Sequence, residues 1–261
     1  MFTQSFHNHT RRCNHATGTE REYVENAIEH NMTMLGFSDH SPYVFDGDYY
    51  SSFRMKQDQI QGYFDTLEAL RDEYKDRLRI HIGFEAEYYP KFFSRYEKLI
   101  SGYPVEYLLL GQHFVYNEIE GISSYAASDS DERLSDYVDQ VSEALSTGMF
   151  ACVAHPDVIQ YTGSEGTYEK QMTRLCEAAK KYNVPLEINL LGIRTNRHYP
   201  NPLFWKIAGQ VGNGVVCGSD AHAAEDVWDG SSFLTAMDMA HKYRLGWTAA
   251  CRILNGGLKQ K

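Results

Sequence analysis

Residues 214–222, GVVCGSDAH, contain the pattern that decides the fold. A short apolar run ends in two side chains that commonly bind metals, Asp220 and His222. Six other runs of similar form occur at residues 2–7, 33–38, 78–86, 105–112, 150–154 and 185–190. Their near-continuous hydrophobicity is typical of parallel strands that are buried on both faces. The sequence therefore predicts seven parallel strands.

Segments with helical periodicity separate these runs. A Thr-x-x-Glu capping box, formed by Thr19 and Glu22, precedes the first of them. The predicted helices cover residues 20–31, 55–75, 91–101, 132–147, 167–182, 201–211, 230–243 and 246–258. Alternating strands and helices predict an α/β fold in which each helix is a crossover between parallel strands. No Gly-x-Gly-x-x-Gly follows the first strand, so the main sign of a dinucleotide-binding open sheet is missing.

Length and composition exclude several classes of protein. The chain has 261 residues, 43% of them hydrophobic and 23% charged, which is ordinary for a globular protein and argues against disorder. No run approaches about 18 consecutive apolar residues, so we expect no membrane span. The formal net charge of −10 argues against a sequence-independent nucleic-acid binder. Without repeats or linker-like segments, residues 1–261 are interpreted as a single domain.

The compartment is predicted from the first residues and the cysteines. No basic segment followed by an apolar one comes after Met1, so a secretory signal is not expected. Five scattered cysteines without CxxC spacing indicate reduced thiols. We expect a cytoplasmic protein.

Polar side chains follow the carboxyl ends of all seven predicted strands. Six strand ends carry metal-binding types, strand six ends with Asn189, and His15 lies in the loop after strand one. The metal-binding candidates are His7, His9, His15, His40, Glu85, His113, His155, Asp220 and His222. In α/β barrels the carboxyl ends of the strands form the catalytic face, whereas an open sheet gathers its ligands at one switch point. The distribution favours a barrel.

The chemistry of these side chains indicates a metal centre. His7 and His9 are two residues apart on an extended chain, so both imidazoles point to the same side. Imidazoles and carboxylates without thiolates suit divalent Zn, Mn or Fe. Nine ligands exceed the needs of one ion, so we expect two to three ions, with Glu85 shared between two of them. Three such ions and two carboxylates leave a charge of about +4, which attracts a phosphate group.

The ordered pattern His7-x-His9, His15, His40, Glu85, His113, His155 and Asp220-x-His222 resembles the nine ligand positions of the PHP (polymerase and histidinol phosphatase) superfamily. The Ser-Asp-His-Ser-Pro turn at residues 38–42 and Gly83-Phe84-Glu85 are similar to the stand-alone histidinol-phosphatase branch. The resemblance implies a distorted (β/α)7 TIM-like barrel with parallel strands and a trinuclear metal centre. It also implies three ligand groups: His7, His9, Glu85 and Asp220; Glu85, His113 and His155; and His15, His40 and His222.

The resemblance further implies hydrolysis of a small phosphate monoester, with L-histidinol phosphate, an intermediate of histidine biosynthesis, as the expected substrate. We expect Glu85, Asp220, His222 and Arg197 to take part in catalysis. Arg197, then Arg194, is expected to bind the phosphoryl group, because a guanidinium matches two phosphate oxygens; the loop with Arg11 and Arg12 is an alternative. Glu87, Asp157 or Tyr161 could receive the amine and imidazole of the substrate.

Three other functions remain open from the sequence. The chain could be a phosphatase of the same fold that acts on another small phosphomonoester or on a phosphotyrosyl protein. It could be a metal-dependent exonuclease, although its acidic balance argues against this. It could also be a non-catalytic metal-binding domain, although a complete ligand set argues against that. The residues do not fix the oligomeric state.

Overall fold

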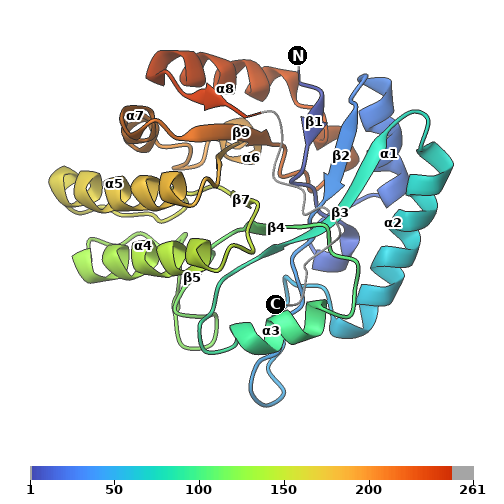
Figure 1. Ribbon diagram of the computed structural model, residues 1–261, viewed down its shortest axis with the longest axis horizontal. Coiled ribbons are helices and arrows are strands. Elements are labelled where there is room, and N and C mark those ends of the chain that lie inside the picture. Colours follow the sequence, from blue (N-terminus) through green and yellow to red (C-terminus); the bar gives the residue numbers. More distant parts are fainter. Residues whose placement is uncertain (1, 249–261) are drawn as a thin grey trace.

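The computed structural model describes residues 2–248. Seven parallel strands follow one another in chain order around a ring, and helices surround them (Figure 1). These strands are β1 (Gln4–Ser5), β2 (Met34–Phe37), β3 (Arg79–Ala86), β4 (Tyr107–Leu110), β7 (Cys152–Val153), β8 (Leu186–Asn189) and β9 (Gly214–Gly218). All seven lie within the apolar runs of the sequence, so the predicted α/β fold with parallel strands is confirmed.

The ring closes at one end only. Just beyond β1 and β9, Asn8 and Ala221 form a parallel bridge, and the backbone N–H of His9 donates to the carbonyl of Ala221 over 2.9 Å. At the opposite end, β9 pairs instead with β10 (Gly246–Trp247), in register Gly246 with Gly214. The barrel is therefore distorted, with a seam between its first and last strands.

Seven of the predicted helices occur, and most begin at a side-chain cap. They are α1 (Glu20–Glu29), α2 (Ile60–Tyr74), α3 (Phe93–Ile100), α4 (Asp131–Ser146), α5 (Glu165–Lys181), α7 (Pro202–Val211) and α8 (Gly230–Tyr243). The capping box of Thr19 and Glu22 is formed as predicted. In Figure 1, α1 and α2 flank β2 and β3, while α4, α5, α7 and α8 cover the other side of the strands.

The structure corrects the sequence prediction at three places. The helix predicted from residue 246 is wrong at its start, because α8 ends at a left-handed Arg244 and β10 follows; residues 249–258 of that prediction lie outside the described part. A short hairpin of β5 (Phe114–Val115) and β6 (Ile122–Ser123) follows β4. A further helix, α6 (Leu190–Arg194), begins directly after β8, where Asn189 caps it.

Two layers of apolar side chains hold the barrel together. The larger lies between strands and helices and includes the fully buried Trp205, Tyr63 and Phe64. The smaller includes Phe6, Tyr107, Leu109, Ala154 and Val216, which lie in or next to β1, β4, β7 and β9 and pack together. The Tyr107 hydroxyl donates to the Phe6 carbonyl over 2.8 Å. No helix within residues 2–248 combines the length and hydrophobicity needed to cross a membrane.

Candidate metal centre and substrate pocket

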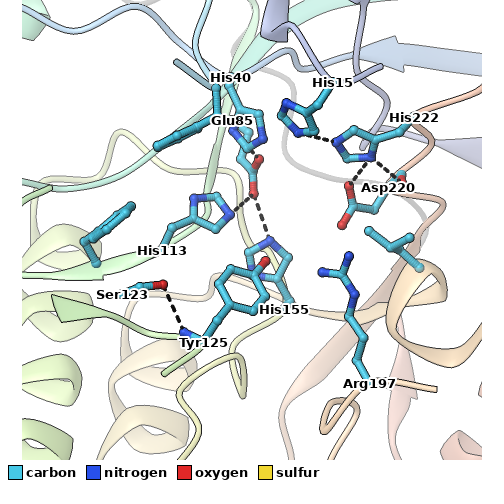
Figure 2. Close-up of a pocket in the computed structure, with 13 residues that line it drawn as sticks. His15, His40, Glu85, His113, Ser123, Tyr125, His155, Arg197, Asp220 and His222 are labelled. Carbon is cyan, nitrogen blue, oxygen red and sulfur yellow. Dashed lines mark hydrogen bonds and ion pairs between the residues drawn. The ribbon is translucent and has the colours of Figure 1, made fainter. Parts of the chain in front are cut away.

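All nine predicted ligand residues meet at the carboxyl-end mouth of the barrel. Seven of them line a cavity of about 440 Å³, and His7 and His9 lie buried beside it. Figure 2 shows Glu85 at the centre of the cluster, with His113 and His155 on one side and His15, His222 and Asp220 on the other. This convergence follows from parallel strands, whose carboxyl ends all face the same side.

Two of these residues have unusual backbone conformations. His155 and Asp220 lie two residues beyond the ends of β7 and β9, with φ values of 28° and 47°. This left-handed region costs a non-glycine residue about 1–2 kcal/mol, so the surrounding structure must hold both residues there. Each turns the chain at the point where its side chain enters the cluster.

The Glu85 carboxylate lies between two groups of imidazoles. Its Oε1 is 2.9 Å from His155 Nε2 and 3.4 Å from His113 Nε2. Its Oε2 is 3.1 Å from His40 Nδ1 and 3.6 Å from His9 Nε2. A Cβ on the neighbouring Gly111 would collide with this carboxylate, so glycine is needed there. Glu85 therefore has the position of a ligand shared between ions.

The nitrogen and oxygen atoms that face the centre of the cluster are arranged as ligands of metal ions and not as hydrogen-bond partners of one another. His7 Nε2, His9 Nε2, His40 Nδ1 and Glu85 Oε2 are buried without a hydrogen-bond partner. The Asp220 Oδ1 atom is 3.1 Å from His9 Nε2 and 3.5 Å from His7 Nε2. Ligands about 2.0–2.1 Å from a tetrahedral ion lie roughly 3.3 Å apart. The spacing and the unpartnered atoms therefore match a shared cation.

Several compact and overlapping groups of ligand atoms occur in the cluster, including three that consist only of predicted ligands. Within each, all ligand atoms lie within 4.8 Å of one another: His7, His9 and Asp220; His7, Glu85 and His155; and His9, His40 and His222. His15 joins at the open side, where its Nε2 is 3.0 Å from His222 Nε2. These groups share members with the three ligand sets expected from the resemblance. The assignment of each residue to a particular ion stays a prediction.

Several imidazoles are held in orientation by a hydrogen-bond partner at Nδ1. His7 Nδ1 lies 2.8 Å from Glu187, and His113 Nδ1 lies 2.7 Å from Glu87. The Nδ1 atom of His15 donates to the Cys13 carbonyl over 2.8 Å. A hydrogen bond at Nδ1 fixes the tautomer and leaves Nε2 free to bind an ion.

Glu187 is the main site residue that the sequence analysis missed. Besides contacting His7, its carboxylate accepts from the backbone N–H of His155 over 3.1 Å and from Asn189 Nδ2 over 3.0 Å. Asn189 Nδ2 also lies 3.0 Å from Asp220 Oδ2. The strand without a metal ligand therefore supports the ligands of its neighbours. A charge within the apolar run PLEINL was the available signal, because a buried carboxylate needs partners.

The electrostatics divide the imidazoles into two kinds. Burial alone would lower their pKa values, but the nearby carboxylates raise the pKa of His7 well above its usual value, that of His9 to about 9 and that of His113 to about 10. Burial and the neighbouring imidazoles lower the pKa of His40, and that of His222 to about 3. The first group must therefore lose protons to bind ions at neutral pH, and the second is already neutral.

Cys13 lies close to the open side of the cluster. Its sulfur is within 4.8 Å of the ligand atoms of His15 and His222. Burial and the Asp39 carboxylate raise its pKa, which favours the neutral thiol. Cysteine binds metal ions as the thiolate, so the neutral thiol of Cys13 is better suited to lie beside the metal ligands than to act as one.

The expected substrate residues are distributed differently from the metal ligands. Arg197 lines the cavity, and its guanidinium points toward His155 and Asp220 (Figure 2). Arg194 does not line it: its guanidinium donates to the carbonyls of Ser219 over 2.7 Å and Asp220 over 2.9 Å. Nor does the alternative arginine pair, since Arg12 is ion-paired with Glu20 and Arg11 lies beside it.

The acidic and phenolic groups considered for the substrate's nitrogens lie outside the cavity lining as well. Asp157 is buried and accepts from the Asn201 backbone N–H, and burial raises its pKa to about 7. Glu87 is ion-paired with Arg54, and the Tyr161 hydroxyl contacts Asp131. Aromatic and apolar side chains line the cavity beside the cluster instead: Phe53, Phe114, Tyr125 and Leu191.

Comparisons with known proteins agree with this geometry. The sequence model described as "PHP domain" matches residues 5–190. A probable histidinol-phosphatase from Deinococcus radiodurans is 28% identical over 227 residues, covering 85% of this chain and 86% of that protein. The histidinol-phosphatase of Bacillus subtilis is 24% identical over 257 residues, covering 85% of this chain and 94% of that protein.

A solved structure shows the same fold. It is histidinol phosphate phosphatase from Lactococcus lactis, complexed with zinc, L-histidinol and phosphate. The TM-score is 0.73 at 20% identity, with 96% of this chain and 98% of that chain covered. The barrel of the present chain is therefore like the barrel of that phosphatase.

Proposed function

This chain belongs to the PHP-domain family, and we propose that it is a metal-dependent phosphomonoester hydrolase acting on L-histidinol phosphate. The observation that carries the proposal is the convergence of nine ligand-type side chains at the mouth of the barrel, where seven of them and Arg197 line one cavity. The histidinol-phosphatase relatives, which match over most of their length, support the choice of substrate. We also propose that residues 1–261 act as one domain.

The proposed ions are two to three divalent transition metals, Zn, Mn or Fe. His7, His9, Glu85 and Asp220 would hold the first, Glu85, His113 and His155 the second, and His15, His40 and His222 the third. When bound, such ions polarise phosphoryl oxygens and lower the pKa of water, so that a nucleophile is available at neutral pH. Zinc in the related Lactococcus structure supports the class of metal.

Arg197 is proposed to bind the phosphoryl group. Arg197 is exposed, and one terminal guanidinium nitrogen donates to the Tyr199 hydroxyl over 2.7 Å. The rings of Tyr125 and Tyr199 lie 5.7 and 5.8 Å from the guanidinium carbon. These contacts hold the planar group at the cavity wall, where its positive charge can offset charge that develops on phosphate oxygens.

The wall beside the cluster suits a leaving group with a flat ring. The Phe53 and Phe114 rings stack with centroids 6.0 Å apart, and Tyr125 stacks on His113 at 6.1 Å. An imidazole can pack against such rings, and its protonated form gains a cation–π interaction. We therefore assign the substrate's imidazole to this aromatic wall in place of Glu87, Asp157 or Tyr161.

Phosphate release tests the proposal. Protein purified without chelator should release phosphate from L-histidinol phosphate, lose this activity after chelation, and regain it with Zn or Mn. Sugar phosphates, phosphotyrosyl peptides and single-stranded DNA are the matched alternatives. Faster turnover of another monoester would change the substrate, faster cleavage of DNA would favour an exonuclease, and no turnover with metals bound would favour a non-catalytic domain.

A further inference from the structure

A buried arginine lies directly behind the pocket. Arg54, in the segment between β2 and α2, is 1% exposed. Its Nη2 is 2.5 Å from a Glu87 carboxylate oxygen and 2.7 Å from one of Glu118, and its Nη1 donates to the Ser41 carbonyl over 2.9 Å. The side chains of Glu87 and Glu118 are also buried. One guanidinium thus joins three separate parts of the chain.

The first of these parts is the metal centre. The second oxygen of Glu87 is 2.7 Å from Nδ1 of His113, a candidate ligand. Arg54 therefore fixes the carboxylate that orients this imidazole. Outer partners of this kind typically affect metal affinity or activity by about 10- to 100-fold.

The other parts are the two sides of the aromatic wall. Glu118 lies in the turn of the β5–β6 hairpin, which also carries Phe114. Phe53 is the residue before Arg54, and the guanidinium carbon is 4.7 Å from its ring centroid. Holding Glu118 and the 41–56 segment together therefore holds Phe53 against Phe114.

Stability alone is a weak reason for such a cluster. Two carboxylates and one guanidinium are withdrawn from water, and buried ion pairs are on balance often no more stabilising than apolar residues of the same volume. A planar fork, however, fixes several partners in defined directions. We propose that Arg54 is a positioning residue that couples the orientation of His113 to the placement of the Phe53–Phe114 wall. The second half of this inference rests on the proposed function.

Three substitutions separate the effect of Arg54 on metal binding from its effect on the Phe53–Phe114 wall. Arg54→Lys keeps the charge but cannot reach Glu87, Glu118 and Ser41 together, so zinc affinity should fall roughly 10-fold and KM for L-histidinol phosphate should rise. Glu118→Gln leaves the Arg54–Glu87 pair intact, so KM should rise while zinc affinity stays unchanged. The matched control is Arg95→Lys, because Arg95 pairs with Asp46 of the same segment over 2.6 Å at the surface. It should change neither quantity.

Zinc affinity is measured by competition with a chromophoric chelator, and KM by phosphate release. Wild-type zinc affinity and KM in Arg54→Lys would overturn the inference, as would an equal loss of zinc affinity in Glu118→Gln. If Arg54→Lys does not fold, Glu118→Gln decides, and a wild-type KM there overturns the coupling to the wall. If the wild-type protein hydrolyses no monoester, the proposed function fails. The zinc affinities of Arg54→Lys and Arg95→Lys then still test whether Arg54 orients His113.

Discussion

Arg197→Lys separates phosphate binding from metal binding. The guanidinium lies at the cavity wall beside the Tyr125 and Tyr199 rings, and it donates a hydrogen bond to the Tyr199 hydroxyl. Lysine keeps the charge but loses the planar fork that can meet two phosphate oxygens. One charge-assisted hydrogen bond is worth about 1.5–3 kcal/mol, so kcat/KM should fall roughly 10- to 100-fold. Metal content should stay at the wild-type value.

The matched comparison is Arg194→Lys, three residues earlier. Arg194 holds the carbonyls of Ser219 and Asp220, so its replacement should loosen the Asp220 loop and weaken metal binding. Both variants are assayed for phosphate release over a range of substrate concentrations, and for metal by elemental analysis after dialysis. An unchanged kcat/KM in Arg197→Lys would refute its assignment to phosphate, and a loss of metal in that variant would refute the separation of roles.

Three further predictions concern the buried charges. Glu85→Gln should leave fewer ions bound and lower activity by roughly 100-fold or more; a near-wild-type rate and metal content would show that Glu85 is not shared between ions. Zinc uptake at pH 7.5 should release two to three protons, because the pKa values of His9 and His113 are raised to about 9 and about 10 and that of His7 is raised as well. Calorimetry in buffers of different ionisation enthalpy counts these protons, and a count of zero would mean that the imidazoles are already neutral. Burial raises the pKa of Asp157 from 3.8 to about 7, so the folded state binds its proton more tightly than the unfolded state does. The free energy of unfolding therefore falls by up to about 4 kcal/mol as pH rises between these values. Asp157→Asn should therefore be more stable than wild type at pH 8 but not at pH 4 in urea unfolding, and an equal difference at both pH values would contradict this.

The candidate ligands could be located from sequence because two regularities act together. Parallel strands are apolar throughout, and their carboxyl ends share one face, so a polar residue after each run must lie at that face. His40, Glu85 and His113 illustrate this, since each lies at or just beyond the carboxyl end of its strand and all three line the cavity. Helix starts such as Thr19 were visible for a similarly local reason, since the cap and its partner are three residues apart.

The supporting groups could not be assigned in this way. Sequence spacing does not show which buried charges meet across the fold, as Arg54 and Glu118 do over 64 residues. It also does not show whether a guanidinium near the site faces substrate or backbone, which is the difference between Arg197 and Arg194. The short β5–β6 hairpin has only two residues per strand, too few for a periodic signal.

The seam between β1 and β9 bears on how the protein is made. A ribosome delivers His7 and His9 about two hundred residues before Asp220 and His222. Until β9 has emerged, Asn8 has no Ala221 to bridge, and the first group of ligands lacks its aspartate. An incomplete chain therefore offers a divalent ion a poorer site than the finished one does. On this reasoning, metal ions would bind last in assembly and would then link the first and last strands of the ring.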